Sequence, residues 1–210
     1  MRLYNWRPKS RAKLKFCNRQ IYAFFCNFAD MGDRKLLNIE LGRVTPAEYK
    51  DLPPSGLVVV LDNIRSAHNV GSAFRTADAF GIDRVLLCGI SAVPPSAEIR
   101  KSALGAEDAV PWQHFDDTMD AVAALRAEGY TLVAVEQTVH SYKLGADFRR
   151  EPGRKYALVF GNEVEGVRQD VVDTSDLALE IPQAGTKHSL NVSVAVGVVL
   201  WHFFCQKRQL

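Results

Sequence analysis

The chain has 210 residues, of which 47% are hydrophobic and 24% are charged, so it can bury a core, and one globular unit is expected. Its four cysteines are widely spread and none forms a Cys-x-x-Cys pair, which argues against a disulfide scaffold and against a zinc site. This cysteine usage fits a reducing compartment, and we expect a cytoplasmic protein that binds no metal.

The net charge of +2 conceals an uneven distribution along the chain. Residues 1–30 hold seven basic side chains and one acidic one, whereas the remainder holds 19 basic and 23 acidic residues, a charge of −4. Residues 1–30 have three interpretations: a poorly ordered leader or targeting segment, an over-extended start with Met31 opening the functional chain, or a basic arm for nucleic acid. Residues 31–55 are a lead-in segment, and residues 56–210 are the main domain.

Two patterns stand out in the lead-in segment. The apolar residues Leu36, Leu37, Ile39 and Leu41 predict a short extended stretch. The sequence Thr45-Pro-Ala-Glu48 that follows is a capping-box pattern, with Thr45 as N-cap, and it predicts the start of a helix.

The main domain alternates apolar runs, typical of strands buried in a parallel sheet, with helical patterns. The expected strands are 56–62, 84–88, 131–135, 156–160 and 177–181. The expected helices are 70–80, 98–104, 116–128 and 192–204. This alternation predicts an α/β fold in which helices flank a parallel sheet. The last apolar run is too short to span a bilayer, which needs about 20 residues, so no membrane association is expected.

Polar residues gather where three of the expected strands end, and open α/β sheets bind ligands at that edge. One group runs from Asn69 to Arg75, a second is centred on Glu163, and a third crowds the start of the last helix. Taken singly, each has a structural explanation, for example Asn69 as an N-cap. Together they predict a ligand site. Neither a P-loop nor a Gly-x-Gly-x-x-Gly fingerprint occurs in the chain.

These three groups resemble the motifs of the SpoU-type (TrmH-like) RNA ribose 2′-O-methyltransferases of the SPOUT class, over residues 57–205. The matching residues, in family order, are Asn69-x-Gly71-x-x-x-Arg75-x-Ala77, then Phe160-Gly161-Asn162-Glu163-x-x-Gly166, then Ile181-Pro182 and Ser189-Leu190-Asn191-Val192-Ser193-x-Ala195. The resemblance implies a deep C-terminal trefoil knot and a homodimer with its active site near the interface. It also implies S-adenosylmethionine as cofactor, held by backbone groups at Gly161, Ile181 and Leu190, with Val135 a looser candidate.

The resemblance further implies roles in methyl transfer to a ribose 2′-hydroxyl. Asn69 and Arg75 would face the target ribose, and Glu163 would steady the arginine or the asparagine. Ser189 and Asn191 would shape the site around the methyl donor and acceptor. Because a guanidinium stays protonated in proteins, we expect Arg75 to stabilise the developing alkoxide and align a phosphate.

The RNA substrate is expected to be tRNA first and rRNA second, because the chain shows no large additional RNA-binding module of the kind some relatives carry. The candidate phosphate contacts share a basic side chain and are Arg65, His68, Arg100, Lys101, Arg149, Arg150 and Lys187. Two alternatives remain: a non-catalytic RNA-binding module built on the same domain, and an ordinary nucleotide-dependent α/β enzyme, which the missing glycine fingerprints disfavour.

Overall fold

The computed structural model describes residues 33–208. The chain divides into two units, and the boundary in the sequence lies between Arg43 and Val44. The interpretations of residues 1–30 concern a segment outside the described residues. The described part of the first unit contains a 3-10 turn, η1 (Asn38–Leu41), where an extended stretch was expected. That expectation is wrong because the Glu40 carboxylate closes a turn: it accepts the Leu37 N–H at 2.6 Å and pairs with Arg34 at 2.6 Å.

The second unit begins with a short turn that is anchored to the main domain. The turn is the 3-10 turn η2 (Glu48–Asp51), and its N-cap is Ala47, so the prediction of Thr45 as N-cap is wrong. The reciprocal contacts expected between Thr45 and Glu48 are nevertheless present: the Glu48 carboxylate accepts the Thr45 N–H at 2.8 Å, and the Thr45 hydroxyl accepts the Glu48 N–H at 3.3 Å. Tyr49 is buried, and its hydroxyl donates to the Ile82 carbonyl at 2.9 Å. This contact fixes the part of the lead-in that belongs to the second unit, residues 44–55, against the core.

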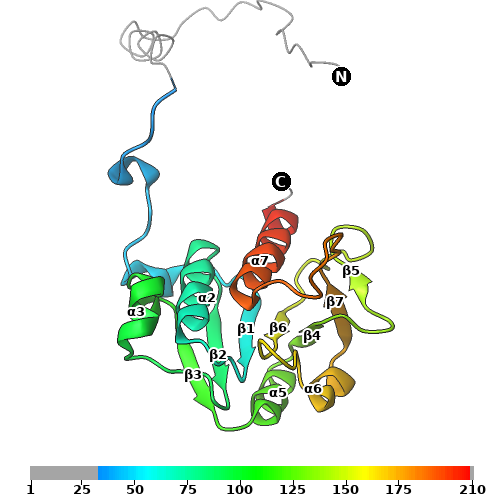
Figure 1. The fold of residues 1–210 in the computed structure, drawn as a ribbon. Helices are drawn as coiled ribbons and strands as arrows, with labels where there is room; N and C mark the ends of the chain where they lie inside the picture. Colours follow the sequence, from blue (N-terminus) through cyan, green and yellow to red (C-terminus); the bar gives the residue numbers. More distant parts are fainter. Residues whose placement is uncertain (1–32, 209–210) are drawn as a thin grey trace, which may run out of the picture. The chain divides into compact units, whose positions relative to one another are not determined.

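The centre of the second unit is a seven-stranded sheet in which every pairing is parallel, in the order β3-β2-β1-β6-β4-β7-β5 (Figure 1). The strands are β1 (Leu57–Asp62), β2 (Arg84–Cys88), β3 (Trp112–Phe115), β4 (Thr131–Val135), β5 (Tyr142–Lys143), β6 (Tyr156–Phe160) and β7 (Leu177–Glu180). The predicted parallel α/β architecture is confirmed. The two strands that were not predicted, β3 and β5, form the edges of the sheet.

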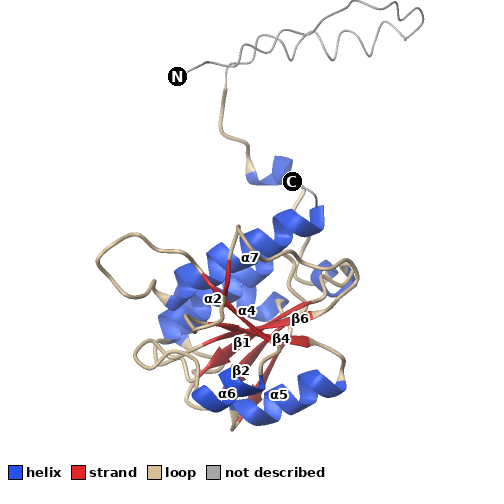
Figure 2. Cartoon of the chain, turned by 90° about the vertical axis from the view of Figure 1, so that its right-hand side faces the viewer, coloured by secondary structure: helices blue, strands red, loops and turns tan. Residues whose placement is uncertain are grey.

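Six α-helices are described in residues 33–208: α2 (Ala67–Ala79), α3 (Ala97–Ala103), α4 (Ala106–Ala109), α5 (Thr118–Ala127), α6 (Gln169–Thr174) and α7 (Val192–Arg208). They cover both faces of the sheet (Figure 2). Alternate strand residues face opposite sides: Val59 and Leu61 pack with α2, α3, α4 and α7, whereas Val58 and Val60 pack with α5 and α6. Within the described residues, no helix has the length and apolar character needed to cross a membrane.

The start of α2 differs from the prediction in a way that matters for the site. The helix begins at Ala67, and Ser66 is its N-cap, with a side chain that accepts the Asn69 N–H at 3.3 Å. Asn69 is therefore not the N-cap. It lies in the first turn, nearly buried, and its side-chain amide is available for other partners.

Candidate functional site

A cavity of about 950 Å³ opens at the carboxyl ends of β4, β6 and β7, and we call it the carboxyl-edge cavity. Val135 ends β4, Gly161 follows β6, Ile181 follows β7, and Leu190 precedes α7; all four line the cavity. These residues are distant in sequence, but parallel strands end at the same edge of the sheet. The structure thus brings together all four residues expected to hold the cofactor.

Three side chains from different segments form a hydrogen-bonded group beside this cavity: Asn69, Glu163 and Asn191. The Glu163 carboxylate accepts the Asn69 side-chain amide at 2.9 Å, and the Asn69 side-chain oxygen accepts the Asn191 amide at 3.2 Å. Asn191 also accepts the Ser193 N–H at 2.9 Å and so caps α7. The group ties the starts of α2 and α7 to the loop after β6.

Glu163 is held in its ionised form by the start of α2. Its two carboxylate oxygens accept the backbone N–H groups of Arg65 at 3.0 Å and Ser66 at 3.1 Å, where the helix dipole also favours negative charge. Burial by itself raises the pKa of the Glu163 carboxyl, but the hydrogen bonds from Arg65, Asn69 and Ser66 outweigh burial and bring the pKa below its ordinary value. Glu163 is therefore suited to positioning Asn69, not to donating a proton at neutral pH.

The loop that carries Glu163 folds back on itself at two glycines. Asn162 and Gly166 exchange backbone hydrogen bonds of 2.9 Å, so the chain returns directly beneath Gly161. A Cβ atom added to Gly161 would lie 2.0 Å from both the carbonyl carbon of Gly166 and the nitrogen of Val167. The tight loop therefore needs glycine at position 161.

Two residues after β4, Glu136 and Gln137, belong to the cavity lining but were not predicted. The Glu136 carboxylate accepts the Val167 N–H at 3.0 Å, and the Gln137 side chain donates to the His188 carbonyl at 2.6 Å. They join the end of β4 to the chain that follows the loop 161–166 and to the segment 182–190. The only signal for them in the sequence is a polar pair directly after an apolar strand.

Arg75 and Ser189 stand apart from the hydrogen-bonded group. Arg75 is exposed on α2, does not line the carboxyl-edge cavity, and has no hydrogen bond or ion pair within residues 33–208. Of the two partners expected for Glu163, the structure pairs it with Asn69, so the pairing with Arg75 is not present. Ser189 is exposed and lines the cavity.

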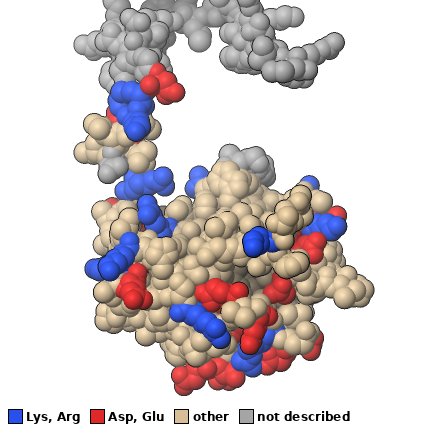
Figure 3. All heavy atoms as spheres, viewed as in Figure 1, with Lys and Arg blue, Asp and Glu red and all other residues tan. Residues whose placement is uncertain are grey.

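The basic residues expected to contact RNA lie in separate places. Arg65, His68 and Lys187 are exposed beside the carboxyl edge of the sheet, and Lys101 is exposed on α3. Arg100 pairs with Asp108 at 2.8 Å and with Glu107 at 3.0 Å, so its charge is already compensated. Arg149 and Arg150 precede β6, and Arg150 lies at the opposite end of the sheet. Figure 3 accordingly shows Lys and Arg side chains dispersed over one face of the domain.

The described residues offer no obvious place for a metal ion. Within residues 33–208, no group of three or more His, Cys, Asp or Glu side chains is arranged to hold one. Cys88, the last residue of β2, is buried, and burial raises the pKa of its thiol to about 12, so it is not a reactive thiolate.

Comparisons with known proteins agree on one family. The chain is 34% identical over 162 residues to the 23S rRNA (guanosine-2′-O-)-methyltransferase RlmB of Nitrosomonas europaea, covering 75% of this chain and 59% of that protein. An AdoMet-bound rRNA methyltransferase from Sinorhizobium meliloti superposes with a TM-score of 0.67 at 29% identity, over 80% of this chain and 62% of the other. A solved structure reported for the 2-OH methylation of C/U34 on tRNA superposes on this chain with a TM-score of 0.64 and 27% identity. The match covers 73% of this chain and 97% of the other.

The shared part is the domain that carries the site. The chain covers 59% to 64% of the length of the first curated relatives it matches. Residues 56–201 match the model of the SpoU rRNA Methylase family. That range contains the carboxyl-edge cavity and the Asn69–Glu163–Asn191 group, and the chain belongs to the SpoU rRNA methylase family.

Proposed function

We propose that this protein transfers a methyl group from S-adenosylmethionine to a ribose 2′-hydroxyl of RNA. The observation that carries the proposal is the hydrogen-bonded group Asn69–Glu163–Asn191 beside the carboxyl-edge cavity, because it joins the three motifs in one place. The relative named as a guanosine-2′-O-methyltransferase and the AdoMet-bound structural neighbour support the reaction and the cofactor.

The carboxyl-edge cavity fits S-adenosylmethionine in size and in lining. Its volume of about 950 Å³ falls in the range of small-molecule sites. Val135, Ile181 and Leu190 offer apolar surface for an adenine ring, and Gly161 lets the backbone come close to a ligand. When bound, S-adenosylmethionine supplies a methyl group on a positively charged sulfur, which a hydroxyl oxygen can displace.

The residues of this chain then have distinct tasks. Glu163 fixes the side-chain amide of Asn69, which faces the ribose, and Asn191 holds Asn69 from the other side. Arg75 stays protonated and stabilises the negative charge that develops on the 2′-oxygen, while aligning a neighbouring phosphate. Ser189 shapes the wall between donor and acceptor. Holding the two reactants together supplies much of the acceleration.

A homodimer explains how Arg75, which is exposed, reaches a site. Three apolar side chains form one stripe along the outer face of α7 and are 38% to 53% exposed: Val194, Val198 and Trp201. Helix α7 packs against α2, which carries Arg75, and Figure 3 shows mainly uncharged atoms over the region of these two helices. We propose that the stripe pairs with a second copy and that Arg75 acts next to that interface.

The trefoil knot implied by the family is part of the same proposal. The segment that leaves β7 at Ile181 is held at His188 by Gln137, which follows β4, and at Asn191 by Asn69 of α2. These contacts support a path in which the segment 181–191 passes between the loops of the carboxyl edge before α7 begins. Such threading departs from the usual rule that chains do not knot.

Our first choice of substrate is tRNA, with rRNA second. In the solved structure reported for methylation of tRNA, the match to this chain covers 97% of the other chain, so a domain of this kind makes up nearly all of that protein. The relatives named as 23S rRNA methyltransferases extend well beyond the matched region. Assaying tRNA and rRNA transcripts side by side decides between the two substrates.

The decisive experiment compares Arg75→Ala with Arg126→Ala, a control that removes an exposed arginine from α5. We expect Arg75→Ala to bind S-adenosylmethionine as the wild type does, by calorimetry, while transfer of labelled methyl to RNA falls about 100-fold or more. Near wild-type turnover of Arg75→Ala would refute its role. If the wild type binds RNA but not S-adenosylmethionine, the protein is a binding module instead.

A further inference from the structure

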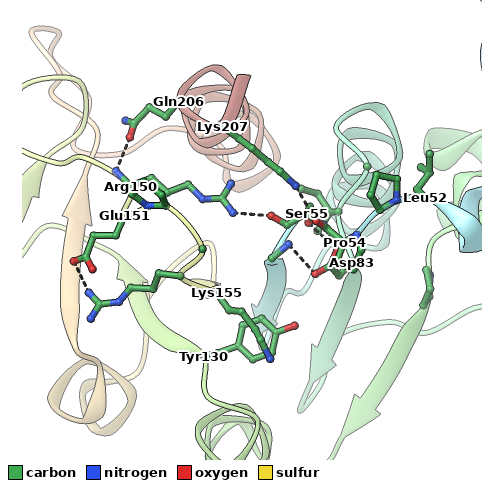
Figure 4. Close-up of a pocket in the computed structure, with 18 of the residues that line it drawn as sticks. Leu52, Pro54, Ser55, Asp83, Tyr130, Arg150, Glu151, Lys155, Gln206 and Lys207 are labelled. Carbon is green, nitrogen blue, oxygen red and sulfur yellow. Dashed lines mark hydrogen bonds and ion pairs between the residues drawn. The ribbon is translucent and has the colours of Figure 1, made fainter. Parts of the chain in front are cut away.

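A second cavity, of about 880 Å³, lies at the opposite edge of the sheet, where β1 and β6 begin. We call it the amino-edge cavity. Its walls come from residues 49–56, the loop 150–155 and the last turn of α7, and it shares no lining residue with the carboxyl-edge cavity (Figure 4). Nothing in the proposed methyl transfer uses it.

Arg150 is the central side chain of the amino-edge cavity. Its guanidinium donates through Nη2 to the Ser55 carbonyl at 2.6 Å, and its backbone N–H donates to Gln206 at 2.5 Å, which fixes the loop to α7. The other terminal nitrogen, Nη1, is shielded from water and has no partner in the described residues. Arg150 as a whole is half-buried and lines the cavity, so its positive charge can act on an anion bound there.

Lys207 reaches the same place from α7. It donates to the Pro54 carbonyl at 2.8 Å, and Figure 4 shows Arg150 and Lys207 converging on the Pro54–Ser55 turn. Burial lowers the pKa of the Lys207 ammonium, and the positive charges of Arg150 and Arg208 lower it further, although Asp83 opposes them. Two cations are therefore held close together with only neutral carbonyl oxygens as hydrogen-bond partners.

The two acidic residues of the cavity lining make hydrogen bonds and ion pairs with other partners, although the charge of Asp83 still acts on Arg150 and Lys207. Asp83 accepts the N–H groups of Ser55 at 2.6 Å and Gly56 at 3.0 Å, and Glu151 pairs with Arg154 at 2.5 Å. Lys155, at the cavity mouth, donates to the Glu128 carbonyl at 3.0 Å and lies over the Tyr130 ring. Arg150, Lys207 and Lys155 form no ion pair within residues 33–208. The cavity lining contains five basic side chains (Lys50, Arg150, Arg154, Lys155 and Lys207) and two acidic ones (Asp83 and Glu151), so positive charge is in excess.

We propose that the amino-edge cavity binds a phosphate group of the RNA backbone through Arg150 and Lys207, with Lys155 at its mouth. A phosphate presents several anionic acceptors, which suit both a guanidinium and an ammonium. The inference rests on the proposed function in one respect, that the ligand is RNA. Strands of five or six residues separate the two edges by about 17 to 20 Å, so the bound phosphate belongs to a nucleotide distant from the methylated one.

A contact so far from the reacting atoms contributes equally to the ground state and the transition state. It should strengthen RNA binding and lower KM without changing kcat at saturating RNA. This separates it from Arg75, whose loss should reduce kcat.

The test measures binding of a labelled tRNA transcript to full-length protein, without S-adenosylmethionine, over a range of salt concentrations. Lys207→Gln changes an exposed side chain, and Arg150→Gln removes the guanidinium; thermal unfolding verifies that both variants fold. Arg126→Gln, which removes one positive charge outside the cavity, is the control. We expect each cavity variant to lose affinity about 3- to 10-fold and its log–log salt slope to fall by about 0.7 to 0.9, the value of one phosphate contact.

Cavity variants that match Arg126→Gln in affinity and slope would overturn the proposal. A second outcome would also overturn it: inorganic phosphate raises the melting temperature of the wild type but not of Lys207→Gln, and yet the two proteins bind RNA with equal affinity. The ligand of the cavity would then be a small phosphorylated molecule. Because binding is measured without methyl transfer, a wild type that binds RNA but never methylates it would refute the proposed function and leave this inference standing.

Discussion

At the scale of single residues, the Glu163 carboxylate is the group on which the arrangement of the site depends. It accepts two backbone N–H groups and the Asn69 amide, and its pKa is lowered as a result. A lowered pKa in the folded state means that the ionised form stabilises the fold above the ordinary carboxyl pKa of about 4.3. That contribution is lost as the pH falls through the lower, folded-state pKa.

We therefore predict that Glu163→Gln lowers the free energy of unfolding by about 1 kcal/mol at pH 7. The difference from the wild type should begin to shrink as the pH falls below the unfolded pKa of about 4.3, and it should disappear below the lowered folded-state pKa, where the Glu163 carboxyl is neutral as well. Urea unfolding at pH 7 and pH 3 measures it. Glu165→Gln, in the same loop, is the control, because its carboxylate accepts no hydrogen bond in the described residues. A difference that is the same at both pH values would contradict the assignment of the ionised form.

Gly161 allows a second prediction at this scale. A methyl group at position 161 meets the backbone of Gly166 and Val167 at 2.0 Å, and backbone cannot move aside as a side chain can. Gly161→Ala should therefore cost about 3 kcal/mol of stability and weaken binding of S-adenosylmethionine, because the loop beside the cavity must open. Gly185→Ala is the matched control, since a Cβ there meets nothing within 4 Å. Equal melting temperatures for the two variants would rule out the tight loop.

At the scale of elements, the sequence predicts the buried parts of the fold better than its edges. The strands 131–135 and 156–160 have the predicted bounds, because continuous apolar runs are typical of strands buried on both faces. The edge strand β3 has no apolar run, and β5 has two residues. The start of α2 was misplaced because Ser66 and Asn69 are both good N-cap residues, and only the structure shows which one caps.

The same limit applies to the site. Parallel strands end at one edge of the sheet, so the polar loops that follow them must lie close together. The approach of Asn69, Glu163 and Asn191 was therefore predictable. Which partner Glu163 takes was not predictable, because Asn69 and Arg75 lie on the same helix and differ in direction. The charge compensation of Arg100 and the exposure of Arg75 depend on contacts between side chains, on which sequence spacing carries no information.

The exposed apolar stripe of α7 leads to a prediction about the oligomeric state. Val194 and Val198 are 50% and 38% exposed on a helix whose other face is fully buried. Val198→Glu should convert a homodimer into monomers, because a charge at the centre of a packed interface is not compensated. Sedimentation equilibrium measures the change. Ile90→Glu, at an exposed apolar residue away from α7, is the control. Should the wild type itself sediment as a monomer, the proposed dimer would be wrong.

At the scale of the whole molecule, the sheet separates two cavities of comparable size, one at each end of its strands. The carboxyl-edge cavity is bordered by Glu163 and Glu136, and the amino-edge cavity by an excess of basic side chains. Because Lys and Arg side chains are dispersed over the face of the domain seen in Figure 3, RNA binding by this domain should come from a few separated contacts. Affinity should then be modest and strongly dependent on salt.

The carboxyl-edge cavity also links elements that are distant in sequence, from β4 to the start of α7, so its ligand should stabilise the domain as a unit. A ligand present at 100 times its dissociation constant adds about 2.7 kcal/mol, which for a chain of this length raises the melting temperature by roughly 5 to 10 °C. We predict this shift with S-adenosylmethionine, a much smaller one with ATP at the same concentration, and a reduced one for Gly161→Ala. Differential scanning fluorimetry measures all three. Equal shifts with ATP and S-adenosylmethionine would show that the cavity recognises an adenosine group without selecting the methyl donor.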